Sequence, residues 1–144
     1  MMPSSTDHLA GLGLSRPESP ESLPRLAEAL EASWGPDTAY RGATRQESRA
    51  FGQCYPTSRV VQWFYPEFEI ASGEVWTGQS TEWHFWNVRG GGADDSIDLT
   101  WAQFPEGSTI RSYVVLGRHD TSDSPPTLTR CEILLRRVLA HLSR

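Results

Sequence analysis

Three residues along the chain are of the types that together carry out nucleophilic catalysis: Cys54, His84 and Asp98. They occur in the order nucleophile, base and orienting acid. A cysteine reacts as the thiolate, and a thiol pKa falls at a helix N-terminus or beside an imidazolium. A carboxylate bonded to the second ring nitrogen of the histidine fixes its tautomer. The residue types therefore point to acyl transfer through a covalent cysteine intermediate.

The elements predicted around these residues would bring them together. Cys54 lies just before a predicted helix that runs from Pro56 to Tyr65 and is stopped by Pro66. Four β-like runs follow, with His84 on the second and Asp98 on the third. Adjacent antiparallel strands lie about 4.8 Å apart, so facing His and Asp side chains can reach each other. The four predicted strands span Phe68–Val75, Glu82–Val88, Ser96–Trp101 and Thr109–Leu116.

Two further helices and a polar connection complete the predicted fold. Ser22 is expected to cap a helix that ends near Trp34, and residues 36–53 read as a connection with one short helical turn. A last helix over Thr127–Leu142 places Cys131 on its apolar stripe, which predicts a core thiol. This order of elements predicts the α+β class, with an antiparallel sheet packed against helices.

Length and composition predict a single domain and restrict its function. Residues 1–21 are rich in Pro, Ser, Gly and Glu and are expected to form a flexible lead-in, which leaves 22–144 as one α+β domain. All thirteen basic side chains are arginines, which excludes Schiff-base lysine chemistry, a Walker-type phosphate loop and a Ser–Lys dyad.

The charge pattern and the apolar runs restrict the partners and the compartment. A net charge of −5 and the absence of any long basic run argue against nucleic acid as a partner. No apolar run approaches 18 residues and no secretory leader is visible, so we expect no membrane partner and a cytoplasmic location. No close pair of ligands such as C-x-x-C suggests a metal, so we expect no cofactor, with a Cys54–His84–Asp98 zinc site as the weaker alternative.

Three short segments carry a resemblance to known cysteine enzymes: Gly52-Gln53-Cys54, His84-Phe85-Trp86-Asn87 and Asp98-Leu99-Thr100. They resemble the G-Q-C, H-x-W-N and D-x-T segments of the transglutaminase-like superfamily of papain-type enzymes, in the same order. The stretch from Trp34 to Phe104 resembles the bacterial YunG-like family. The resemblance implies a transglutaminase-like or papain-like core, with Cys54 as nucleophile, His84 as base and then acid, and Asp98 as the orienting group.

The chain also departs from the animal transglutaminases. Its catalytic segments are more closely spaced, Tyr55 and Pro56 follow the cysteine, and calcium-binding domains are absent. The resemblance therefore implies a compact acyl-transfer core rather than transamidation itself.

Four more residues are candidates for binding substrate or an oxyanion. Gln53 and Asn87 could donate hydrogen bonds into the site or serve the backbone instead. Trp86 shares strand parity with His84 and is the expected pocket wall, whereas Trp83 and Phe85 should face the other way. In the resembling enzymes an upstream tryptophan donates to the oxyanion, a place that Trp34 would take here.

Two functions from different classes agree with these features. The first is a cysteine hydrolase or acyltransferase (amidase, peptidase or transamidase) acting on a peptide, protein or small-molecule amide. The second is a non-catalytic module that binds a peptide or small ligand in a tryptophan-lined groove, favoured by five tryptophans between positions 63 and 101.

Overall fold

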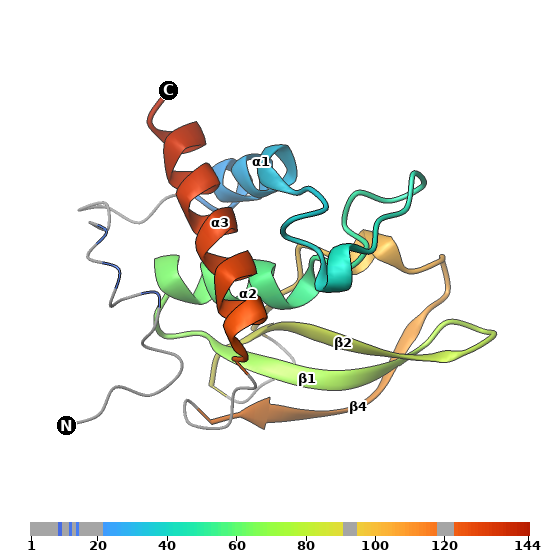
Figure 1. Cartoon of the computed structure of the whole chain (residues 1–144). Helices are drawn as coiled ribbons and strands as arrows, with labels where there is room; N and C mark the ends of the chain where they lie inside the picture. The colour runs from blue at the N-terminus through green and yellow to red at the C-terminus, as the bar shows by residue number, and fades with distance from the viewer. Residues whose placement is uncertain (1–8, 10–11, 13, 15–21, 91–94, 118–122) are drawn as a thin grey trace.

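The computed structural model describes residues 9, 12, 14, 22–90, 95–117 and 123–144. Within them the chain forms three α-helices, four strands and two short 3₁₀ helices (Figure 1). The α-helices are α1 (Leu23–Ser33), α2 (Cys54–Phe64) and α3 (Pro125–Leu142); the strands are β1 (Glu69–Trp76), β2 (Thr81–Val88), β3 (Ser96–Ile97) and β4 (Thr109–Leu116); the 3₁₀ helices are η3 (Tyr40–Gly42) and η4 (Trp101–Gln103).

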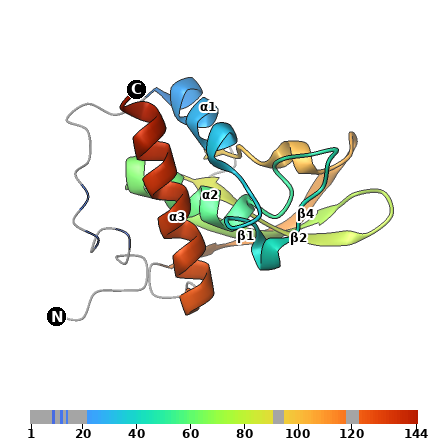
Figure 2. The ribbon, with the colours of Figure 1, turned by 45° about the horizontal axis from the view of Figure 1, so that its top comes forward.

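The four strands form one antiparallel sheet in the order β3-β2-β1-β4. In Figures 1 and 2 the three α-helices lie together on one side of this sheet. Helix α2 is the layer next to the sheet and contacts β1 and β2, while α3 packs on both α1 and α2. The α+β class with helices packed against an antiparallel sheet is thus confirmed.

The main core lies between the helices. Every residue of α2 from Pro56 to Phe64 is buried, because this helix has the sheet on one side and α3 on another. Cys131 on α3 is fully buried, as its place on the apolar stripe predicts, and burial raises the pKa of its thiol to about 12. Leu9, inside the predicted lead-in, is buried against this core, whereas most of residues 1–21 lie outside the described residues.

Helix boundaries follow the capping residues. Ser22 caps α1 by accepting a hydrogen bond from the Arg25 N–H at 3.4 Å, as predicted. Ser124 does the same for α3, so that helix begins at Pro125, two residues before the predicted start. The predicted short turn in the polar connection is η3, and β4 has the predicted bounds.

The expected third strand over 96–101 is wrong beyond its first two residues. Strand β3 ends at Ile97, and a turn leads into η4. The cause is local, because the Asp98 carboxylate accepts hydrogen bonds from the N–H of Thr100 at 3.3 Å and from its hydroxyl at 3.5 Å. Such a side-chain-to-backbone bond competes with strand pairing, so Asp98 lies after the strand rather than on it.

In the described part of the chain no helix is both long enough and apolar enough to cross a bilayer.

Candidate active site

Cys54 is the first residue of α2 rather than the residue before it. The chain turns sharply into the helix at Gly52, which has a φ of +79° and whose added Cβ would lie 2.9 Å from the Ala43 carbonyl oxygen. A side chain at this position would be strained and crowded. The Gly52 carbonyl accepts a hydrogen bond from the Tyr40 N–H at 2.9 Å, which ties this turn to η3.

The start of α2 is electrostatically suited to an anion at Cys54. No side chain of the described residues caps this helix, and Pro56 at its third position has no N–H. The N–H groups of Cys54 and Tyr55 therefore keep the partial positive charge of a helix N-terminus. Below them, the Ser58 hydroxyl donates to the Cys54 carbonyl at 2.8 Å.

His84 on β2 and Asp98 after β3 are directly hydrogen-bonded. His84 Nε2 lies 2.7 Å from Asp98 Oδ2. The other carboxylate oxygen, Oδ1, accepts the two bonds from Thr100. Both oxygens of Asp98 are thus engaged, which fixes its orientation toward the imidazole ring.

Three aromatic rings pack around the buried imidazole. The His84 side chain is 0% exposed. Trp86 stacks on it at a centroid distance of 5.5 Å and an interplanar angle of 22°, and Phe104 meets it edge-on at 4.8 Å. Trp101 of η4 makes a third ring contact. The carboxylate of Asp98 therefore acts on the ring in surroundings from which water is excluded.

Burial and hydrogen bonding act on the pKa of His84 in opposite directions. Burial alone lowers the pKa, because it disfavours the charged ring. The hydrogen bond and charge of Asp98, followed by the electrostatic effect of the Cys54 side chain, outweigh burial and raise the pKa of His84 to about 9. At neutral pH the ring is therefore an imidazolium.

The structure brings Cys54 close to the remaining ring nitrogen. Asp98 occupies Nε2, and the Cys54 thiol is among the groups that raise the His84 pKa. The nitrogen left to interact with the thiol is Nδ1, which is buried and forms no hydrogen bond of good geometry with any described residue. Cys54, His84 and Asp98 thus lie in one contiguous cluster.

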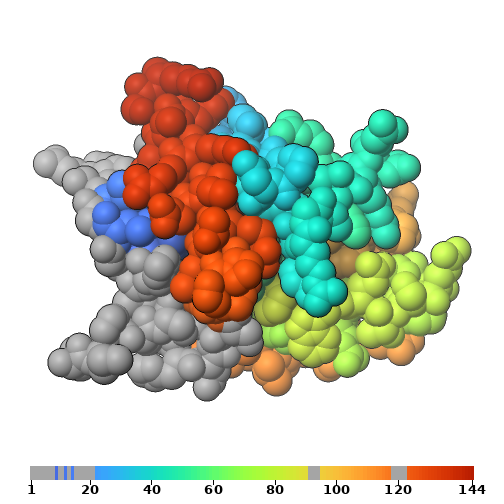
Figure 3. Space-filling model, in the orientation of Figure 1, coloured from blue at the N-terminus to red at the C-terminus, as the bar shows by residue number. Residues whose placement is uncertain are grey.

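Cys54 opens into a cavity of about 520 Å³. In Figure 3 the surfaces of the α1–α2 connection (cyan), of β1 and β2 (yellow-green) and of the first turns of α3 (orange) meet on the face shown. The cavity is lined by Tyr40, Ala43, Phe51, Gly52, Cys54, Tyr55, Glu82, Trp83, Phe85 and Gln103.

The aromatic walls of this cavity differ from those expected. Trp83 and Phe85 line it, whereas Trp86 is buried against His84. Alternation along β2 holds as predicted, but α2 covers the face of the sheet that carries Phe85, and the Tyr55 ring of α2 meets Phe85 edge-on at 4.9 Å. The His84 ring instead stacks on Trp86 and contacts Trp101 of η4 and Phe104, which follows it.

The side chains of the other candidate residues form hydrogen bonds around the start of α2 and do not line the cavity. Gln53 is buried; its side-chain oxygen accepts from the Thr38 hydroxyl at 2.8 Å, and its amide donates to the Gly35 carbonyl at 3.0 Å. Asn87 donates from Nδ2 to the Ser58 carbonyl at 3.0 Å. The Trp34 Nε1–H donates to the Thr57 hydroxyl at 3.0 Å. All three brace the first two turns of α2.

Sequence reasoning missed several residues that surround Cys54. Tyr55 and Gln103 line its cavity, and their signals in the sequence were adjacency to Cys54 and a place in the stretch that resembles the YunG-like family. The buried ion pair of Arg59 with Asp123, at 2.8 Å, joins residues 64 positions apart. No local pattern signals such a pair.

The structure also bears on metal binding. Among the described residues, no group of three or more His, Cys, Asp or Glu side chains is placed to hold a metal ion. The zinc site that these residue types would also permit is therefore not formed by Cys54, His84 and Asp98.

Comparison with known families bears on the resemblance seen in the sequence. A family model described as YunG protein matches residues 22–143, which is most of the chain and includes all three α-helices and the whole sheet. No curated protein and no solved structure matches the chain. The resemblance to the YunG-like family is confirmed by the extent of this match: the chain belongs to the YunG family.

Proposed function

We propose that the protein is a cysteine acyl-transfer enzyme in which Cys54 is the nucleophile, His84 the general base and then acid, and Asp98 the orienting carboxylate. The observation that carries this proposal is the 2.7 Å bond from His84 Nε2 to Asp98, which leaves Nδ1 for the thiol at the start of α2. The three residues would then act as a catalytic triad, which consists of a nucleophile, a base and a group that orients the base.

In the proposed resting state His84 is an imidazolium beside the Cys54 side chain. With a His84 pKa of about 9, the ring holds its proton throughout the neutral range. The helix N-terminus and the imidazolium both favour negative charge on Cys54. The thiolate then attacks the amide carbonyl carbon of a substrate in the 520 Å³ cavity, forming a C–S bond as the carbonyl electrons move onto oxygen.

The remaining steps return the site to its resting state. The N–H groups at the start of α2 stabilise the developing oxyanion. His84 gives its proton to the leaving amine as the C–N bond breaks, which leaves a thioester on Cys54. Water or a second amine, deprotonated by His84, then attacks the thioester and releases the thiolate, while Asp98 stabilises the imidazolium that forms again.

We also propose that the core of the fold is of the transglutaminase-like or papain-like type. A cysteine at the start of a central helix, packed against an antiparallel sheet that carries the histidine, resembles the transglutaminase-like or papain-like arrangement. The support is the G-Q-C, H-x-W-N and D-x-T order together with the position of Cys54 at the helix start. Fold analogy alone leaves the reaction open, so the chemistry rests on the residues themselves.

The second candidate, a binding module without chemistry, is favoured by one observation. Trp83 is 57% exposed and Tyr40 is equally exposed beside the cavity, as expected for rings that contact a ligand. A purely binding role, however, gives no reason for a buried histidine held protonated beside a cysteine. The two candidates differ in whether Cys54 is reactive.

Alkylation by iodoacetamide at pH 7 tests the proposal. We expect Cys54 to react at least about tenfold faster than free cysteine, because a free thiol of pKa about 8.5 is only a few per cent thiolate. Intact mass and peptide mapping identify the modified residue, and Cys54→Ser should abolish labelling. The buried Cys131 provides the matched control, since Cys131→Ser should leave the rate unchanged.

A second variant links the reactivity to the imidazole. His84→Gln should lower the rate to that of free cysteine or below. A wild-type rate no higher than that of free cysteine, or a His84→Gln rate equal to the wild-type rate, contradicts the proposed enzyme and favours the binding module. Incubation with a set of amide and ester acyl donors, with the added mass read on Cys54, then identifies the acyl group.

A further inference from the structure

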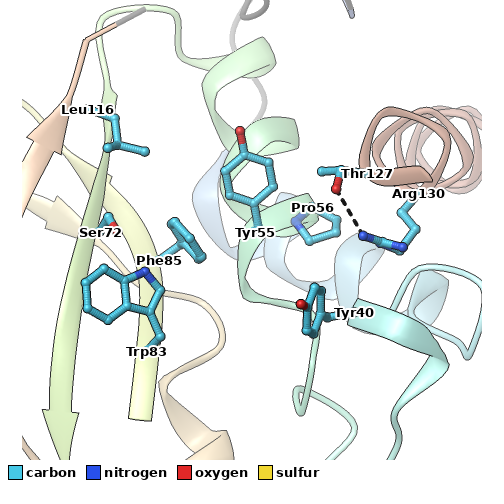
Figure 4. A pocket seen from close by; sticks show the side chains of 9 residues that line it. All are labelled: Tyr40, Tyr55, Pro56, Ser72, Trp83, Phe85, Leu116, Thr127 and Arg130. Carbon is cyan, nitrogen blue, oxygen red and sulfur yellow. Dashed lines mark hydrogen bonds between the residues drawn. The ribbon is translucent and has the colours of Figure 1, made fainter. Parts of the chain in front are cut away.

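A second cavity, of about 330 Å³, adjoins the one that contains Cys54. The two cavities share four walls, the rings of Tyr40, Tyr55, Trp83 and Phe85. Figure 4 shows Ser72, Trp83, Phe85 and Leu116 of the sheet on one side, Pro56, Thr127 and Arg130 of the helices on the other, and Tyr55 between them. A substrate attached to Cys54 can therefore continue into this second cavity.

Arg130 is the only charged residue among the described residues that line the second cavity. Its guanidinium donates to the Thr127 hydroxyl at 3.0 Å and lies 5.7 Å from the Tyr40 ring centroid. No carboxylate of the described residues pairs with it, whereas other arginines there do have carboxylate partners. Although the chain has a net charge of −5, none of the carboxylates in the described ranges forms an ion pair with this cation.

The two cavities differ in the sign of their charge. Glu82 lines the cavity of Cys54 and Arg130 lines the adjoining one. A negatively charged group on a substrate is therefore attracted by Arg130 in the second cavity and disfavoured beside Glu82 on the wall of the first. Between them the exposed ring of Trp83 and the rings of Tyr55 and Phe85 offer an apolar surface.

We propose that the 330 Å³ cavity binds a carboxylate-bearing apolar group of the substrate, with Arg130 as the residue that recognises the carboxylate. The substrate class is then an amide whose reacting carbonyl lies at Cys54 and whose aromatic or aliphatic part ends in a free carboxylate. A planar guanidinium suits a carboxylate because it donates two parallel N–H bonds to it. This assignment of substrate class rests on the proposed function of Cys54.

A pair of thiol reagents tests the assignment without knowledge of the natural substrate. N-chloroacetyl-phenylalanine carries the free carboxylate, and N-chloroacetyl-phenylalaninamide is the matched neutral reagent. In both cases the Cys54 sulfur forms a bond to the methylene carbon and chloride leaves. We expect the carboxylate reagent to label Cys54 about tenfold faster than the amide, as a charge-assisted hydrogen bond allows.

Variants of α3 distinguish recognition of the carboxylate by Arg130 from a general effect of the net charge of the protein. Arg130→Gln should remove the preference for the carboxylate reagent, and Arg130→Lys should keep part of it. Arg136→Gln removes the same charge from an exposed site paired with Glu132, so it should retain the full preference. Thermal unfolding followed by circular dichroism verifies that each variant is folded.

The outcomes distinguish this assignment from the proposed function. Equal labelling by the two reagents in the wild type, or an unchanged preference in Arg130→Gln, overturns the assignment while fast iodoacetamide labelling still supports the enzyme. A preference lost in Arg130→Gln without fast iodoacetamide labelling supports the carboxylate site but contradicts the activated cysteine.

Discussion

At the scale of single residues, the chemistry depends on how Asp98 holds the charge of a buried ring. His84 is surrounded by Trp86, Trp101 and Phe104, which by themselves disfavour an imidazolium. Asp98 is the strongest of the groups that oppose this effect. Replacing the Asp98 carboxylate with an amide should therefore have a large effect on the charge of His84.

Asp98→Asn should slow alkylation of Cys54 at pH 7 by at least about tenfold, because without the carboxylate burial lowers the pKa of His84 and the ring loses its proton. The pH dependence of the alkylation rate provides the measurement, and the rise in rate should move to higher pH in the variant. Glu106→Gln removes the same charge from an exposed residue and is the matched control, which should keep the wild-type pH profile. An unchanged pH profile in Asp98→Asn would show that Asp98 does not set the charge of the ring.

The raised pKa of His84 also predicts how stability depends on pH. The folded pKa of about 9 lies above the ordinary value of 6.5, so the folded state binds this proton more tightly than the unfolded state. The stabilisation is complete below about pH 6.5 and is lost as pH rises through 9. The free energy of unfolding should fall by up to about 3 kcal/mol between pH 6.5 and 9.

Urea unfolding at several pH values measures this slope. His84→Gln removes the titrating ring and should leave a flatter dependence over the same interval. If wild type and His84→Gln lose stability in parallel, another group is responsible for the slope.

The candidate residues of the site could be chosen from the sequence, but most of their contacts could not be predicted from it. The order of Cys54, His84 and Asp98 singled out the residues that the structure brings together. Strand alternation placed Trp86 on the same side as His84, which is where it stacks. Alternation does not indicate which face of the sheet α2 covers, and the walls at Trp83 and Phe85 were therefore missed.

At the scale of elements, α2 is the element that positions the nucleophile. Its first turn is braced from three directions, by Gln53, Asn87 and Trp34. The bonds of Asn87 and Trp34 are buried and that of Gln53 to Gly35 is partly buried, and an unmade hydrogen bond in such places is costly. The position of Cys54 therefore depends on polar side chains that never contact the thiol.

Gln53→Ala should lower the free energy of unfolding by about 2–4 kcal/mol. The change removes the bonds to Thr38 and Gly35 and creates a cavity beside the start of α2. Urea unfolding gives the difference. Gln79→Ala, in the exposed turn between β1 and β2, is the matched control and should stay within about 0.5 kcal/mol of wild type; an equally small loss in Gln53→Ala would contradict the bracing role.

The elements could be predicted from the sequence where a local signal defined both of their ends. Ser22 marks the start of α1, and β4 is a run whose observed bounds match the prediction. The prediction of the third strand was wrong after Ile97 because it rested on a β-like run of residues. The hydrogen bond from the Thr100 N–H to the Asp98 carboxylate turns the chain away from β2 there. A side chain that satisfies the backbone outweighs a propensity of a few tenths of a kcal/mol.

At the scale of the whole molecule, one buried ion pair links the helix of the nucleophile to the segment before α3. Arg59 of α2 and Asp123 are 1% and 0% exposed in their side chains and lie 2.8 Å apart. Asp123 also accepts a hydrogen bond from the Tyr55 hydroxyl at 2.6 Å, and burial together with this bond raises the pKa of Tyr55. The ring that walls both cavities is thus held by the same carboxylate.

Asp123→Asn should therefore cost about 3–5 kcal/mol of stability, because it keeps the shape of the side chain but removes the carboxylate charge that pairs with the buried Arg59 guanidinium. Asp37→Asn provides the matched control: Asp37 pairs with Arg137 of α3, and both side chains are more than 40% exposed, so its loss should cost less than about 1 kcal/mol. Urea unfolding of the two variants at pH 7 measures the difference. Similar small losses in both would mean that solvent reaches Arg59 readily, and the link between α2 and α3 would then rest on their apolar contacts alone.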